Sequence, residues 1–217
     1  NVTRFPYEIV RLAEDSKLPR TSQPSPASFM QVYEDAAAAG DEVLVITIGQ
    51  KLSGTYQCAH LAAADVGLQV HIVDSEAASQ AEALLVREAV RLRDEEGLTA
   101  EEIAAVLEQF KKRVRIVAVV DSLKHLQKGG RLPAAVAIVG GALGIKPVLS
   151  IAGANKTVAK VRGDRNLIPK MTQLYAEMAR DVKGEYIIAY GNNPEQGKEL
   201  AAAIRKLSGR APVFMGP

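Results

Sequence analysis

The sequence predicts an α/β fold with mostly parallel sheets, and three observations lead to this prediction. Short continuous apolar runs such as 42–48 are bounded by turn residues, as buried parallel strands are. Longer segments with helical periodicity alternate with these runs along the chain. The 217 residues are enough for one large or two small domains, each with its own core.

The first 75 residues are predicted to hold two helices and two strands. Ser25 is a suitable N-cap, Pro26 is favoured in a first helical turn, and Gly40 is a common helix terminator. A loop that carries Ser53-Gly54-Thr55 is expected to lead into an Ala-rich helix that ends near Gly67. The predicted order is a helix from Pro26 that Gly40 ends, strand 42–48, the Ala-rich helix that ends near Gly67, and strand 68–73, closing at Asp74-Ser75.

The remaining residues continue the alternation. Thr99 with Glu102 three residues later forms a capping-box pattern at the start of a helix. We place a domain boundary after Ser75, which gives an N-terminal α/β domain over 1–75 and a C-terminal α/β domain over 76–217. The predicted order is helices 79–96 and 99–112, strand 115–120, an apolar helix 132–145, strands 147–151 and 157–161, helix 167–182, strand 185–190 and a helix from Asn193-Pro194 to 207.

Composition and charge argue against several classes of function. The 27 Lys and Arg against 25 acidic residues give a net charge of +2, too balanced for a nucleic-acid-binding face. We interpret the basic run around Lys111 as a solvated helix end beside the negative pole of the helix dipole. Cys58 is the one cysteine and the 3 histidines are scattered, so we expect no metal site and a cytoplasmic protein.

One apolar segment tests the possibility of a membrane span. From 132 to 153 the only charged side chain is Lys146. Pro147 would break a helix that reached it, and the uninterrupted part, 132–145, is too short to cross a bilayer. We therefore expect a buried helix rather than a transmembrane one.

Two polar clusters lie where an α/β protein binds ligands. The first is Thr21-Ser22-Gln23-Pro24-Ser25-Pro26, directly before a helix, and the second is Lys51-Leu52-Ser53-Gly54-Thr55, between a strand and a helix. A helix start offers unpaired N–H groups, Gly54 permits close approach of a ligand, and hydroxyls donate further hydrogen bonds. Such neutral donors suit a single carboxylate, whereas a polyphosphate calls for a Gly-rich loop with a lysine. The candidate ligand-binding residues are Thr21, Ser22, Ser53, Gly54 and Thr55. Taken alone, either cluster is more often a helix cap.

Five short motifs occur in an order that resembles the signature of the DegV family, and they span most of the chain. They are Thr21–Pro26, Leu52-Ser53-Gly54-Thr55-Tyr56, Asp74-Ser75, Gly129-Gly130-Arg131 and Ile145-Lys146-Pro147. The resemblance implies a two-domain α/β protein that holds a long-chain fatty acid, such as palmitate, stearate or oleate, between its domains. It further implies a carrier that is not an enzyme and needs no cofactor, with the carboxylate bound by Thr21, Ser53 and N–H groups near Gly54.

The same resemblance implies a protein partner. Some members of the family present their fatty acid to a separate fatty acid kinase, which makes an acyl phosphate. The arginines that matter for this step correspond here to Arg131 and Arg162. Without the resemblance, Arg131 is equally explained by a capping or salt-bridge role and Arg162 by a solvated charge at a strand end.

The sequence departs from the family pattern in three places. Gly49-Gln50 stands where the family usually carries Ser-Ser, which would thin the hydrogen-bond network around the head group. The family's first strand and Asp-Ser turn are not found upstream of Thr21, and its His-Thr-Gly-Pro-Gly run is not found near the C-terminal Phe214–Pro217. We expect further residues at both ends, because a sheet without its first strand would expose an edge.

A bound acyl chain needs a long apolar sleeve, which we place along the apolar helix 132–145. Burial of each methylene contributes about 0.8 kcal/mol. Small residues on this helix either permit close helix packing or leave room for a tunnel. The candidate tunnel residues are Val136, Val139, Gly140 and Leu143.

Two other functions remain open from the residues alone. Ser53 is a possible nucleophile of a serine-dependent acyl hydrolase, although the sequence has no Gly-x-Ser-x-Gly elbow. A phosphosugar- or nucleotide-binding protein would use the same helix starts for a phosphate group.

Overall fold

The computed structural model describes residues 21–121, 123–132, 145–152, 154–179, 184–191 and 193–216. Packing divides the chain into two units. The β1 unit, named after strand β1 (Val43–Thr47), comprises Ser22–Ala118 and Leu149–Lys156. The β6 unit, named after strand β6 (Ile187–Ala189), is drawn from Asn1–Thr21, Val119–Val148 and Thr157–Pro217.

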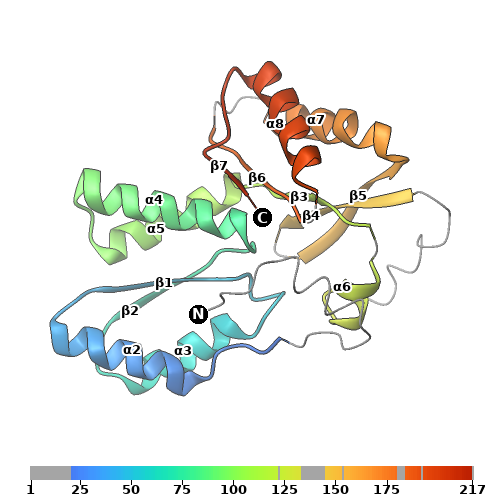
Figure 1. The fold of residues 1–217 in the computed structure, drawn as a ribbon. Coiled ribbons are helices and arrows are strands. Elements are labelled where there is room, and N and C mark those ends of the chain that lie inside the picture. Colours follow the sequence, from blue (N-terminus) through green and yellow to red (C-terminus); the bar gives the residue numbers. More distant parts are fainter. Residues whose placement is uncertain are drawn as a thin grey trace. The chain divides into compact units, whose positions relative to one another are not determined.

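The β1 unit is a three-layered α/β arrangement. Its two strands pair in parallel, helices α2 and α3 lie on one face of them, and α4 and α5 lie on the other (Figure 1). This arrangement confirms the predicted α/β class with parallel pairing. The elements are α2 (Pro26–Ala39), β1, α3 (Thr55–Asp65), β2 (Val70–Asp74), α4 (Gln80–Glu96), α5 (Ala100–Phe110) and the 3-10 turn η1 (Lys111–Arg113).

The register of β1 and β2 fixes the place where the unit gathers its polar residues. Val43 pairs with Val70 at one end, and Thr47 pairs with Asp74 at the carboxyl end. A core of apolar side chains anchors α4 and α5 against this sheet, so the carboxyl ends of both strands are held in place from one side. The core residues are Val73, Leu85, Ala89, Leu92, Ile103 and Leu107.

The predicted caps form as expected. Ser25 Oγ accepts the Ser28 N–H at 3.2 Å at the start of α2, whose Pro26 occupies the first turn. Gly40 ends this helix in the left-handed conformation, with φ of 74°. Thr99 and Glu102 form the reciprocal capping box at the start of α5.

A three-stranded sheet has the order β3–β4–β5, from β3 (Val117–Val119), β4 (Ile145–Ala152) and β5 (Ala154–Arg162). The Val120 N–H donates to Pro147 O at 3.3 Å, and the Ile151 N–H donates to Ile116 O at 3.2 Å. Residue numbers thus rise along one strand while they fall along the other, so β3 and β4 pair antiparallel. The short helix α6 (Lys124–Lys128) follows β3.

The β6 unit carries a second parallel pair, β6 with β7 (Phe214–Gly216). Helices α7 (Leu167–Met178) and α8 (Pro194–Ser208) pack on each other, and α8 packs on both strands. The turn η2 (Asp164–Asn166) leads into α7. Tyr186, Ile188 and Ile204 form the buried core of this unit.

The domain boundary that we predict after Ser75 falls within the β1 unit. The reason is that α4 and α5, which follow Ser75, pack against β1 and β2, which precede it. Across the described ranges, no helix combines the length and the apolar character needed to cross a membrane. The apolar helix predicted over 132–145 lies almost wholly outside the described residues.

Candidate functional site

The candidate site is the carboxyl edge of the β1–β2 pair. Beyond Thr47 the chain turns through 48–54 into α3, and beyond Asp74 it turns through 75–79 into α4. Ligands of open α/β sheets bind at this edge, because the loops that leave the strands converge there with the starts of the following helices. The residues of both loops therefore decide what the site can bind.

The binding turn, as we call Gly49–Thr55, presents two hydroxyls together. Ser53 Oγ and Thr55 Oγ1 lie 2.8 Å apart, and either of them can be the donor. The Thr55 N–H also points to Ser53 Oγ, at 3.4 Å. The turn is closed by Gly49 O, which accepts the N–H groups of Leu52 at 2.8 Å and of Ser53 at 3.2 Å. Since the hydroxyl pair uses one of its two protons, the other can be donated to a bound anion.

Gln23 brings the two predicted polar clusters together. Its carboxamide lies against Gly54, where a Cβ atom would come within 2.9 Å of it. Its Nε2 also points to the Cys58 Sγ at 3.7 Å. The absence of a side chain at Gly54 therefore makes room for the Gln23 carboxamide. The sequence pattern does not predict this role for either residue.

The hydroxyl-bearing residues beside Gln23 differ in what they do in the structure. Thr21 and Ser22, both predicted to bind the ligand, are exposed to solvent. Ser25 in the same motif caps α2, so its hydroxyl acts as the capping alternative expects. Ser53, Gly54 and Thr55 are half-buried.

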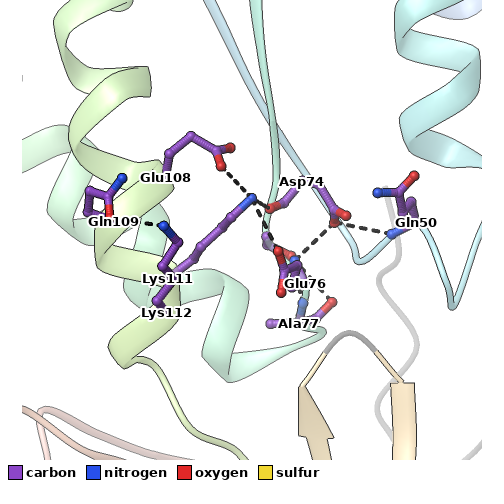
Figure 2. A network of polar contacts seen from close by, with 9 residues as sticks. Gln50, Asp74, Glu76, Ala77, Glu108, Gln109, Lys111 and Lys112 are labelled. Atoms are coloured by element: carbon purple, nitrogen blue, oxygen red, sulfur yellow. Dashed lines mark hydrogen bonds and ion pairs between the residues drawn. The ribbon is translucent and has the colours of Figure 1, made fainter.

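The end of β2 and the β2–α4 loop, residues 75–79, are hydrogen-bonded to the binding turn (Figure 2). Asp74 Oδ1 accepts the N–H of Gln50 at 3.1 Å and that of Glu76 at 2.9 Å. The Gly49 N–H donates to Ala77 O at 2.8 Å. Asp74 entered the sequence analysis only as part of a motif, and the structure shows that its carboxylate links the two loops.

Gly49 lies at a close approach of the two loops. A Cβ atom there would lie 3.2 Å from the backbone of Glu76 and of Ala77, tighter than side chains normally pack. The departure from the family's Ser-Ser pattern therefore coincides with a tight backbone contact between the two loops. The Thr47 hydroxyl is buried beside them and has no hydrogen-bond partner within the described ranges.

The side chain of Lys111 is largely buried, which corrects the interpretation of its basic run as solvated. Its side chain is only 7% exposed, and its Nζ lies 2.8 Å from a Glu108 carboxylate oxygen and 3.5 Å from one of Glu76. It also donates to the backbone oxygen of Asp74 at 3.0 Å. Burial by itself lowers the pKa of Lys111, but Glu108 and then Glu76 hold that pKa above its ordinary value. The neighbouring Lys112 is exposed, as predicted, and donates to Gln109.

The two arginines predicted to contact a partner lie on the β6 unit and are both exposed. Arg131 donates from Nη1 to Gly129 O. Arg162 offers its backbone oxygen to Asn166 Nδ2 at 2.7 Å, which ties the end of β5 to η2.

Lys146, from the Ile145-Lys146-Pro147 motif, forms the centre of a three-residue ion cluster in the β6 unit. Its Nζ lies 2.8 Å from an Asp121 oxygen and 2.7 Å from an Asp164 oxygen. Hydrogen bonds to Asp121 and then to Asp164 raise the pKa of Lys146 above its ordinary value. The sequence pattern alone indicates no role for this lysine.

Two further predictions concern the residues that line a tunnel and the presence of a metal site. The candidate tunnel residues Val136, Val139, Gly140 and Leu143 all lie outside the described residues. Among the residues that are described, no group of three or more His, Cys, Asp or Glu side chains is arranged to hold a metal ion.

Known proteins share both the sequence pattern and the fold. The family model described as "Uncharacterised protein, DegV family" matches residues 7–216. A DegV domain-containing protein from Caldanaerobacter subterraneus is 34% identical over 201 residues, which cover 91% of this chain and 71% of that protein.

Two solved structures extend the likeness to three dimensions. A DegV family protein from Thermus thermophilus, described as binding fatty acid, superposes with a TM-score of 0.83 at 32% identity, covering 98% of this chain and 77% of that one. A stearic-acid-binding protein from Eubacterium ventriosum superposes with a TM-score of 0.85 at 26% identity, covering 97% of this chain and 75% of that one. By sequence and by fold, the chain belongs to the DegV family.

Proposed function

We propose that this protein binds one long-chain fatty acid and carries it without changing it chemically. The carboxylate is held by the hydroxyls of Ser53, Thr55 and Thr21, with Ser22 and the backbone at Gly54 beside them. The fatty acids bound by the two similar solved structures support this choice of ligand. The observation in this chain that carries the proposal is the Ser53–Thr55 hydroxyl pair at the start of α3.

The hydroxyl pair suits a carboxylate for a physical reason. A carboxylate accepts hydrogen bonds and donates none, so it needs donors that are free to turn toward it. Hydroxyl protons can rotate, and the first turn of α3 adds the partial positive charge of a helix start. The ammonium of Lys111, in contrast, already faces Glu108 and Glu76, which leaves Lys51 as the charged donor of the binding turn beside its neutral hydroxyls.

We place the acyl chain against Val136, Val139, Gly140 and Leu143, as the sequence predicts. A saturated chain of palmitate length gains about 0.8 kcal/mol for each methylene that leaves water. The tail therefore supplies most of the affinity, and the hydroxyls select the acid from neutral lipids of similar length. We place this carrier in the cytoplasm.

We further propose that the bound acid is presented to a fatty acid kinase through Arg131 and Arg162. Both guanidinium-bearing side chains are exposed, as contact with a partner or with an acyl phosphate requires. A guanidinium binds phosphate oxygens through paired N–H groups, so either arginine has the chemistry for this role.

Native mass spectrometry of the protein purified from bacteria tests the proposed ligand. We expect one bound fatty acid per chain, identified after organic extraction, and its loss when Thr21 and Ser53 are both changed to Ala. Ser208→Ala is the control, since it removes a half-buried hydroxyl at the end of α8, hydrogen-bonded to Arg210 O, and should retain the lipid.

A protein that carries no lipid and takes up neither palmitate nor oleate would refute the proposal. Labelling of Ser53 by a serine-reactive probe would then favour a hydrolase. Phosphate-dependent binding of a sugar phosphate or nucleotide would favour the anion-binding alternative.

A further inference from the structure

The largely buried side chain of Lys111 lies outside the binding turn, and its burial is unusual for a lysine. A cation at the end of α5 is favourable, but exposed residues such as Lys112 and Arg113 provide that charge without leaving water. Burying a lysine is costly unless its donors are all satisfied. Here they are shared among Asp74 O, at the end of β2, Glu76, in the β2–α4 loop, and Glu108, in α5 (Figure 2).

The loop that Lys111 contacts has an unusual backbone. Glu76 and Ser79 have φ values of 53° and 56°, in the left-handed region that non-glycine residues rarely adopt. Such conformations persist only where surrounding contacts hold them. Lys111 supplies two of these contacts, one to the backbone oxygen of Asp74, two residues before Glu76, and one to the Glu76 carboxylate.

Asp74 and the same loop accept two backbone N–H groups of the binding turn. The Gln50 N–H reaches the Asp74 carboxylate at 3.1 Å, and the Gly49 N–H reaches Ala77 O at 2.8 Å. Gly49 O in turn accepts from Ser53, which carries one hydroxyl of the proposed head-group site. A continuous series of contacts therefore connects the end of α5 with that hydroxyl.

We propose that Lys111 is a positioning residue for the binding turn, because its ammonium fixes the β2–α4 loop in the conformation that anchors Gly49 and Gln50. Part of this inference concerns the ligand-free protein, and part deepens the proposed function by predicting that the head-group hydroxyls depend on Lys111. The two parts are tested separately.

The first test is amide hydrogen exchange in the ligand-free protein. Lys111→Met keeps the side-chain length and removes the charge and donors, and Lys112→Met is the matched control at the next residue. We expect the Gly49 and Gln50 amides to exchange about tenfold faster in K111M, relative to core amides such as Leu85, and to stay unchanged in K112M. Glu76→Gln, which retains the lysine but weakens one partner, should give a smaller change in the same direction.

Unchanged exchange at Gly49 and Gln50 in K111M would overturn the positioning role. So would an equal increase at Leu85, since that would show a general loss of stability rather than release of the turn. Because no ligand is needed, this result stands even if the protein proves not to bind fatty acids.

The second test is palmitate affinity, measured well below the unfolding temperature of each variant. We expect K111M to bind about tenfold more weakly, as loss of roughly one well-oriented hydrogen bond would cause, and K112M to bind as the wild type does. Lys111→Arg, which keeps the charge, should restore part of the affinity. A K111M protein with the wild-type affinity but a lower unfolding temperature would show that Lys111 is merely structural. Failure of the wild type itself to bind palmitate would instead refute the proposed function.

Discussion

At the scale of single residues, Gly54 is the point where the two motif-bearing segments meet. The Gln23 carboxamide occupies the space that a Cβ atom at Gly54 would need. The backbone of Gly54, with φ of −75°, is open to any residue, so the requirement for glycine here is one of space. The effect of a substitution should therefore fall on Gln23 rather than on the turn itself.

Gly54→Ala should displace Gln23 from Cys58 and expose that thiol. Because only the end of a flexible side chain must move, we expect a loss of less than about 1 kcal/mol in the free energy of unfolding. The rate at which a thiol reagent labels Cys58 measures the displacement and should rise. Gln23→Ala should have the same effect.

Gly67→Ala is the control for this substitution, since a Cβ atom there meets nothing within 4 Å. Labelling of Cys58 should be unchanged in this variant. Equal labelling rates in the Gly54→Ala variant and the wild type would show that Gln23 does not shield the thiol.

Sequence reasoning at this scale found the hydroxyl-bearing residues of the candidate site but not what holds them. Ser53, Gly54 and Thr55 stand out because their types at a helix start suggest anion binding. Lys111 looked solvated because it opens a basic run, and its partner Asp74 lies 37 residues away. A contact between distant residues leaves no local pattern, so only the folded chain could reveal it.

At the scale of elements, the capping box of α5 makes a local and measurable contribution. Glu102 N–H donates to Thr99 Oγ1 at 3.3 Å, and the Thr99 N–H donates to Glu102 Oε2 at 2.9 Å. A further first-turn N–H, that of Ala100, donates to Glu42 at 2.8 Å, which ties the helix start to the residue before β1. Thr99→Ala should therefore lower the free energy of unfolding by about 1 kcal/mol, as measured by urea titration.

The contribution of the Thr99–Glu102 capping box to the free energy of unfolding should also decrease as the pH falls. Hydrogen bonds from the Thr99 N–H and then from its hydroxyl hold the pKa of Glu102 below its ordinary value. A carboxyl whose pKa is lowered by folding contributes stability above its unfolded pKa and loses it as the pH falls through the folded pKa. The difference in stability between the wild type and Glu102→Gln should thus shrink between about pH 5 and pH 2.

Glu101→Gln is the control for this pH dependence. Glu101 lies in the same first turn and shares only the effect of the helix dipole. If both variants show the same pH dependence, the reciprocal hydrogen bond contributes nothing beyond that dipole.

Element boundaries were predictable where a cap or a turn marks them. Ser25-Pro26, Thr99 with Glu102, and Asn193-Pro194 each begin a helix in the structure as predicted. Strand β7 was missed, because three residues with two exposed side chains show no periodicity of their own. It becomes a strand through its pairing with β6, and that pairing is a tertiary interaction.

At the scale of the whole molecule, ligand binding should raise the unfolding temperature. A ligand that binds only the folded state at a hundredfold excess over its Kd adds about 2.7 kcal/mol of stability. For a chain of this size that corresponds to roughly 5–10 °C. We expect palmitate to give this shift in a thermal unfolding experiment.

Methyl palmitate is the matched control, because it keeps the acyl chain and lacks the carboxylate. Its shift should be clearly smaller if Ser53 and Thr55 bind the acid group. Equal shifts for the acid and the ester would mean that the hydroxyl pair does not recognise the head group.

The division of the chain into units was the least predictable feature at this scale. The sequence suggests a boundary after Ser75, where the motif-rich half gives way to longer helices. Yet α4 and α5 bury Leu85, Leu92 and Leu107 against the preceding strands. Apolar periodicity shows that a helix has a face to bury, but not which sheet will cover it.

The tight contact at Gly49 also constrains how this site can change over evolutionary time. A serine at this position would press its Cβ atom against the backbone of Glu76 and Ala77. The β2–α4 loop would have to shift by a few tenths of an ångström to admit it, and that shift would alter the hydrogen bond from the Gly49 N–H to Ala77 O. A substitution at Gly49 is therefore coupled to the β2–α4 loop, and we expect changes at the two places to affect each other.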